Sequence, residues 1–122
     1  MFVLDTNILI LYLRKDPWVT EWIEKHILRG ERFTISILTV TELLSYPALQ
    51  ESERLSIDEI LRDLLILELD MSTARLAARY RREYKLKAID ALIAATAYLR
   101  VATLVTKDSA FKKLGKSNVM IL

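Results

Sequence analysis

Four acidic side chains stand where a carboxylate can take part in chemistry, next to or inside apolar segments that are expected to be buried. They are Asp5, Glu42, Asp90 and Asp108. The chain has no cysteine and a single histidine, His26, so it cannot form a metal site built from cysteine or histidine ligands. Several carboxylates that supply only oxygen ligands describe a site for a hard cation, Mg²⁺ or Mn²⁺. Because substrate phosphate commonly completes the coordination shell of Mg²⁺, these four carboxylates favour phosphate or phosphodiester chemistry.

The elements that must position these acids are short apolar runs alternating with helical patterns. The run Met1–Leu4 predicts a buried strand that delivers Asp5 into a polar turn of Thr6 and Asn7. Further strands are predicted over Arg32–Leu38, Leu65–Leu69, Thr103–Val105 and Asn118–Leu122. Strands that alternate with helices predict an α/β sandwich with a mostly parallel sheet.

In such a sheet, ligands sit just beyond the carboxyl ends of the strands. Asp5 follows the first strand, Glu42 opens the helix after the second, and Asp108 follows the fourth, so all three are expected at that edge. Asp90 is the one charged residue in an apolar helix over residues 88–99. We expect Asp90 to be partly buried, and a buried charge is costly unless a partner such as a divalent cation neutralises it.

Each acid also has a plain structural interpretation. Asp5, Asp90 and Asp108 fit turn or N-cap positions, and Glu42 fits the third position of a capping box, Thr39–Glu42, that opens a helix limited by Pro47. Other helix starts are predicted at Asp16 with Pro17, at a capping box over Ser56–Glu59, and at Ser72.

Composition limits the class of protein. At 122 residues and 52% hydrophobic content, residues 1–122 are expected to form a single domain with its own core. The net charge of +2 is too small to argue for nucleic acid by itself. The sequence contains no membrane span or signal-peptide pattern, so a cytoplasmic protein is expected.

Four segments, taken in order, resemble one known family. They are DTN at Asp5, Ser-x5-Glu-Leu with Ser36 and Glu42, DALIAATA from Asp90 to Ala97, and LVTKDxxF from Leu104 to Phe111. Together they look like a PIN-domain nuclease. Within that family, the size and the lack of extra domains look like the VapC toxins of prokaryotic toxin–antitoxin pairs.

The resemblance implies a metal-dependent ribonuclease with a five-stranded parallel sheet in a three-layer α/β/α sandwich. By motif position, Asp5, Glu42, Asp90 and Asp108 would hold Mg²⁺ or Mn²⁺, with Asn7 and Thr106 in supporting roles. Many relatives carry a second acid directly before the phenylalanine of the last motif, where this chain has Ala110. An antitoxin partner of the VapB type, an RNA substrate and a homodimer are also expected from the resemblance.

Clustered cations are candidates for holding phosphate. They are Arg75, Arg79, Arg81, Arg82, Lys85 and Lys87 before Asp90, and Lys107, Lys112, Lys113 and Lys116 around Asp108. The first group fits a solvated helix face equally well. Tyr80, Tyr84, Phe111, Trp18 and Trp22 are expected to pack rather than to stack on bases. An apolar groove among Trp18, Trp22, Leu43, Leu44 and Tyr46 would suit an antitoxin peptide.

Two other classes remain open from the residues alone. A receiver-like phosphoacceptor domain would also place acids, a lysine such as Lys107 and Mg²⁺ at the carboxyl edge of a parallel sheet. It requires a phosphorylatable aspartate at the end of a central strand, for which Leu65–Leu69 offers only Asp70. A non-catalytic interaction module is the other alternative.

Overall fold

A parallel sheet forms the centre of the molecule in the computed structural model, which describes residues 1–115 and 118–122. Within those residues the sheet has five strands in the order β3-β2-β1-β4-β5, and every pairing is parallel. The strands are β1 (Phe2–Leu4), β2 (Phe33–Ser36), β3 (Leu65–Leu67), β4 (Thr103–Thr106) and β5 (Val119–Ile121). The predicted parallel sheet is confirmed. Four strands lie within their predicted limits, whereas β4 extends one residue beyond them, to Thr106.

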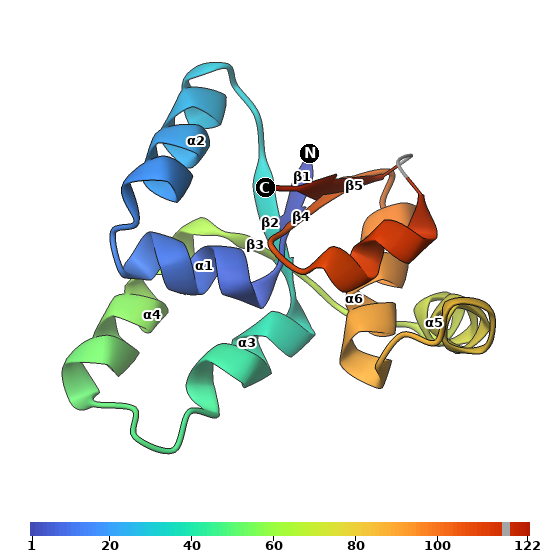
Figure 1. The fold of residues 1–122 in the computed structure, drawn as a ribbon. Coiled ribbons are helices and arrows are strands. Elements are labelled where there is room, and N and C mark those ends of the chain that lie inside the picture. The colour runs from blue at the N-terminus through green and yellow to red at the C-terminus, as the bar shows by residue number, and fades with distance from the viewer. Residues whose placement is uncertain (116–117) are drawn as a thin grey trace.

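Helices cover both faces of this sheet (Figure 1). On one side lie α1 (Thr6–Leu13), α2 (Pro17–Leu28), α3 (Ile37–Leu44) and α4 (Glu51–Asp63); on the other lie α5 (Met71–Tyr84), α6 (Ala88–Leu99) and the 3-10 helix η1 (Ser109–Leu114). The arrangement is a three-layer α/β/α sandwich, as predicted. None of these helices is both long enough and apolar enough to cross a membrane, within the residues described.

A separate apolar core fills each side of the sheet. On the first side, Ile8, Val19 and Ile57 come from different helices and pack in one buried cluster. On the second side, the fully buried Ile93 and Phe111 pack against strand residues. Two alanines of α6, Ala94 and Ala97, pack in the same cluster. Both faces of the strands are therefore buried, as expected for a parallel sheet.

The order of the strands creates a crevice at the middle of the sheet. The chain runs from β1 outward through β2 to β3, and then crosses to β4 on the other side of β1. The direction of winding therefore reverses between β1 and β4. In open α/β sheets, ligands bind outside the carboxyl ends of the strands at such a switch point.

Helix starts are only partly as predicted. Asp16 caps α2, with Pro17 in the first position, and its carboxylate accepts a hydrogen bond from the backbone N–H of Val19. The predicted start at Ser56 is wrong, because α4 begins earlier with a capping box between Gln50 and Glu53.

The predicted cap at Ser72 is also wrong. Asp70 caps α5 instead, and its carboxylate accepts from both the N–H and the hydroxyl of Thr73. Several residues in each segment are able to cap a helix. The point where the chain leaves the preceding element decides which of them does so.

Candidate active site

Asp5 lies at the switch point, directly after β1. Its backbone N–H donates to the carbonyl of Val105 at 2.9 Å, which continues the β1–β4 ladder by one residue. Its carboxylate caps α1: Oδ1 accepts from the N–H of Thr6 at 2.8 Å. The other oxygen, Oδ2, accepts from the Thr106 hydroxyl at 2.7 Å and from the Asn7 amide at 3.1 Å. All of these donors are neutral, and Asp5 is only 6% exposed.

The surroundings of Asp5 oppose its negative charge. Burial is the largest effect and raises the pKa of Asp5 above its ordinary value of 3.8, while the hydrogen bonds from Thr106 and Thr6 act in the opposite direction. The carboxylates of Glu42 and Asp108 raise the pKa further by repulsion. A buried carboxylate that faces other carboxylates is a group on which a cation would have a large favourable effect.

Thr106 and Asn7 join the ends of β1 and β4. The fully buried Thr106 hydroxyl accepts from the N–H of Asp108 at 3.0 Å while it donates to Asp5. The Asn7 side chain accepts from the N–H of Lys107 at 3.0 Å and donates to Asp5 through its amide nitrogen. Both expected supporting residues therefore lie in contact with the carboxylate of Asp5.

Glu42 reaches the same place from α3, but not as a capping-box residue. Ser36 caps this helix, which begins at Ile37, so Glu42 is its sixth residue and the predicted capping box over 39–42 is wrong. The reason is that β2 leads into α3 without a loop. The Thr6 hydroxyl donates to Glu42 Oε1 at 2.6 Å, which ties α3 to the start of α1.

Asp90 stands in the first turn of α6, three residues after the N-cap Lys87. It is half-buried, as predicted. Burial is the main cause that raises the pKa of Asp90, and repulsion from Asp5, Asp108 and Glu42 adds to it. The helix dipole and Lys87 favour its charge, yet the opposing effects are larger. Asp90 thus lies close enough to the three other carboxylates to be repelled by each of them.

Asp108 completes the set from the loop after β4. It caps η1, and its Oδ1 accepts from the N–H of Ala110 at 2.8 Å. That bond uses the carboxylate as a cap, which is the plain interpretation of this residue, but it leaves the second oxygen available within the described part of the chain. The structure therefore brings the four predicted acids to one edge of the sheet.

The donor set fits a hard cation that keeps most of its water. In the described residues, none of the four carboxylates forms a salt bridge with a lysine or arginine. No three of the Asp, Glu or His side chains described are arranged to enclose an ion by themselves. Mg²⁺ is usually bound through one or two carboxylates, with waters and substrate phosphates as its other ligands. The site has the chemistry for that kind of binding.

A contact between Trp18 and Lys107, which the sequence did not predict, lies beside these acids. Trp18, expected to pack, is 52% exposed, and the Lys107 ammonium lies 4.7 Å from the centre of its ring. By contrast, Phe111 is fully buried and Tyr80 packs edge-on against Tyr84, as expected. The spacing of Trp18 and Trp22 gave no signal of the difference between them.

The predicted cations differ in what they contact. Arg79 is engaged in a salt bridge with Glu83 at 3.0 Å, whereas Lys112 and Lys113 are exposed on η1. Lys116 lies outside the described residues. Asp70, the receiver-like candidate, follows the edge strand β3 and serves as a helix cap, so its placement does not support a phosphoacceptor role.

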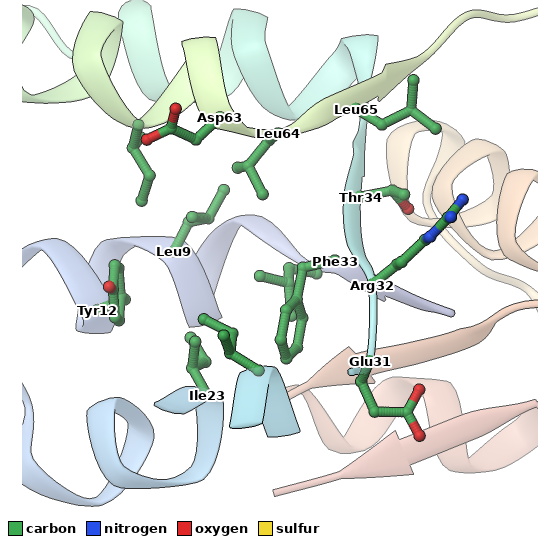
Figure 2. A pocket seen from close by; sticks show the side chains of 13 residues that line it. Leu9, Tyr12, Ile23, Glu31, Arg32, Phe33, Thr34, Asp63, Leu64 and Leu65 are labelled. Atoms are coloured by element: carbon green, nitrogen blue, oxygen red, sulfur yellow. The ribbon is translucent and has the colours of Figure 1, made fainter. Parts of the chain in front are cut away.

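The predicted apolar groove is divided between two places. Leu43 and Tyr46 line a cavity of about 290 Å³ between α1, α3 and α4, whereas Trp22 packs against Phe2 and Phe33 on another face. A second cavity, of about 480 Å³, opens between α1, α2, α4 and the start of β2. Figure 2 shows its mainly apolar side chains, with charged groups around them.

Fold and site together define an α/β protein with carboxylates gathered at the switch point of a parallel sheet. The chain belongs to the PIN domain family, whose sequence model matches residues 2–117. Domains of this family are generally nucleases. No curated protein matches the sequence.

Solved structures extend the similarity to the whole chain. A toxin–antitoxin complex from Klebsiella pneumoniae contains a chain that is 28% identical, with 98% of this chain and 96% of that chain covered and a TM-score of 0.80. FitAcB from Neisseria gonorrhoeae is 30% identical, with 98% and 96% covered and a TM-score of 0.79. VapBC2 from Rickettsia felis, bound to a promoter DNA fragment, shares the fold at 24% identity, with 99% and 98% covered and a TM-score of 0.85.

Proposed function

We propose that this chain is a metal-dependent ribonuclease that hydrolyses RNA phosphodiester bonds and acts as the toxin of a VapBC-type toxin–antitoxin pair. The observation that carries the proposal is the environment of Asp5. Its buried carboxylate receives only neutral hydrogen bonds and faces Glu42 and Asp108, at a position where parallel sheets bind ligands. Without a cation, this arrangement would also repel a phosphodiester.

The proposed roles follow from the contacts of each residue. Asp5, Glu42, Asp90 and Asp108 hold Mg²⁺ or Mn²⁺. When bound, such an ion lowers the pKa of a coordinated water and offsets the negative charge that develops on the phosphate.

Asn7 and Thr106 are positioning residues, because their hydrogen bonds to Oδ2 fix the orientation of the Asp5 carboxylate. Thr6 does the same for Glu42 through its hydroxyl.

The test is cleavage of a labelled single-stranded RNA by the wild type, by Asp90→Asn and by Asp63→Asn, each with Mg²⁺, Mn²⁺ or EDTA. Asp63 is the matched control because it ends α4, with one residue between it and β3, and therefore lies at the amino ends of the strands rather than at their carboxyl ends. We expect cleavage by the wild type and by Asp63→Asn only with metal, and none by folded Asp90→Asn.

An intact RNA with every metal, or equal cleavage by Asp90→Asn, would refute the catalytic assignment. The non-catalytic interaction module would then be the better interpretation. The wild type must be free of bound antitoxin in these assays, since an inhibitor would otherwise mimic a negative result.

An antitoxin is the partner proposed for the cavity in Figure 2. The structures similar to this chain are toxin–antitoxin complexes, and the cavity offers apolar walls with Arg32 and Asp63 at its edge. Ile27 lines it and is half-exposed, while the neighbouring Leu28 is exposed and does not line it. We expect Ile27→Glu to abolish copurification with the proposed antitoxin when the two proteins are co-expressed, and Leu28→Glu to retain it. Equal copurification of the two variants would exclude this cavity.

A homodimer and a cytoplasmic location complete the proposal. Sedimentation of the purified chain tests the dimer, which predicts twice the 14.1 kDa mass of one chain. Fractionation of cells that express the chain tests the location.

A further inference from the structure

Trp18 and Lys107 have no role in the chemistry proposed above, yet they lie beside it. We propose that these two side chains form a binding position for one nucleotide of a single-stranded RNA, in which the indole stacks on the base and the ammonium contacts a phosphate. This inference rests on the proposed function, because it supplies the means by which the substrate is held next to the carboxylates.

The position of Trp18 is fixed by the turn between α1 and α2. Lys15 adopts the left-handed conformation, with φ of 60°, and the N–H of Asp16 donates back to the carbonyl of Leu11 at 2.9 Å. Asp16 then caps α2, so Trp18 stands as its second residue on a rigid helix start. The backbone at Trp18 is therefore already ordered, so a ligand that stacks on the indole does not have to order it.

The core does not require the indole of Trp18. Trp22, one turn further along α2, is the tryptophan that packs against the core. Its ring lies 5.3 Å from that of Phe2 and 4.0 Å from that of His26. Trp18 remains 52% exposed. An exposed indole is a surface on which any nucleobase can stack, since every base has a π-face.

Lys107 links this indole to the carboxylates. Its backbone N–H donates to the Asn7 side chain, which in turn donates to Asp5, and the next residue along the chain is Asp108. Its ammonium reaches over the Trp18 ring at 4.7 Å. The indole therefore lies about one lysine side chain away from the acids that are proposed to hold metal.

The combination of groups favours a polynucleotide over a peptide. A polynucleotide presents a flat base and a phosphate within each repeat, and so matches an indole and an ammonium at the same time. An acidic peptide would gain the contact with Lys107 but does not present a flat base beside each negative charge, so the indole would lack its stacking partner. A neutral peptide would leave the ammonium without a partner.

The binding test uses fluorescence. The chain has two tryptophans, so Trp22→Phe makes Trp18 the only tryptophan emitter while an aromatic ring remains in the core. This protein is titrated with a single-stranded oligodeoxynucleotide of about 12 nucleotides, long enough for one binding site, and with the same strand lacking its bases. A deoxy strand is chosen because it is not the substrate of a ribonuclease. We expect quenching of Trp18 by the intact strand, with an affinity about 5- to 100-fold higher than that of the abasic strand.

The kinetic test measures RNA cleavage in the presence of Mg²⁺ or Mn²⁺. Trp18→Ala is expected to raise KM about 5- to 100-fold, far more than it changes kcat, and Trp18→Phe to restore part of that loss. Lys107→Gln retains the backbone N–H and is expected to raise KM and to weaken the salt dependence of binding. Trp22→Phe is the control and should leave KM unchanged.

The outcomes separate this inference from the proposed function. Equal affinity for the two strands, or an unchanged KM in Trp18→Ala, overturns the inference while the ribonuclease assignment stands. A response of Trp18 to the antitoxin but not to either strand also overturns it and assigns the position to the protein partner. Base-dependent quenching by a protein that cleaves no RNA supports the binding position and refutes the proposed function instead.

Discussion

Replacing Thr106 by valine tests whether the end of β4 is built to hold Asp5. The hydroxyl is fully buried and donates to Asp5 at 2.7 Å, and it accepts from the N–H of Asp108 at 3.0 Å and from the Asn7 amide at 3.3 Å. Valine has almost the same shape, so the change removes these three hydrogen bonds with little effect on packing. A matched control is Thr103→Val at the start of the same strand, where the threonine hydroxyl makes no hydrogen bond within the described residues.

The magnitude follows from the bonds to Asp5 and Asp108, because the Asn7 amide retains its own bond to Asp5 after the change. A hydrogen bond to a charged group contributes about 1.5 to 3 kcal/mol, and one between neutral groups about 0.5 to 1.5 kcal/mol. Asp5 is buried, so solvent does not replace the lost donor. We therefore expect Thr106→Val to lower the free energy of unfolding by about 2 to 4 kcal/mol, which corresponds to about 6 to 20 °C in Tm for a domain of this size. Thr103→Val should change it by less than about 0.5 kcal/mol.

The pH dependence provides a second check. The Thr106 hydroxyl lowers the pKa of Asp5, because it stabilises the ionised form. Its contribution is therefore present above the pKa of Asp5 and decreases as the pH falls through that pKa. Urea unfolding in EDTA, at neutral pH and near pH 3, measures the loss of stability in Thr106→Val and its dependence on pH. A loss below about 1 kcal/mol, or one equal at the two pH values, would refute the role assigned to Thr106.

Three further outcomes are expected. In EDTA, the free energy of unfolding should fall as the pH rises from below 3.8. The reason is that the pKa values of Asp5 and Asp90 are raised in the folded protein, so the folded protein binds more protons than the unfolded chain in this pH range. Asp90→Asn should make this pH dependence weaker, as measured by melting curves. Adding Mg²⁺ at neutral pH should raise the stability of the wild type and of Asp63→Asn by about 2.7 kcal/mol at a concentration 100 times Kd, and a similar rise in Asp90→Asn would contradict the proposed ligation. Val101 has a φ of 53° in the turn after α6 and is 93% exposed, so Val101→Gly should raise the free energy of unfolding by about 1 kcal/mol, whereas Val101→Ala should not.

The order of the elements could be predicted from the sequence because it depends on local patterns. The apolar run before Asp5 and the β-branched run that ends at Ser36 have the length and composition of buried strands. The polar residues that follow each run then fall at the carboxyl edge of a parallel sheet, whatever the order of its strands. This is why Asp5, Glu42 and Asp108 could be expected at one edge before their contacts were known.

Details of local structure were harder to predict, because several residues compete for the same role. Ser36 rather than Thr39 caps α3, and Asp70 rather than Ser72 caps α5. All four are able to accept a hydrogen bond from a helix N-terminus. The difference in energy between such alternatives is small, and the packing of the helix against the sheet decides between them.

The amino-acid sequence thus determined which residues carry charge, which segments are apolar and in what order they follow one another. Only the tertiary structure decided that β1 is central, that the winding reverses beside Asp5, and that Trp18 lies under Lys107 while Trp22 is packed in the core. Local patterns report the burial of one face of a segment, because that depends on neighbours three or four residues away. The contact between Trp18 and Lys107 joins positions far apart in the chain, and it exists only because the sheet brings the end of β4 next to the start of α2.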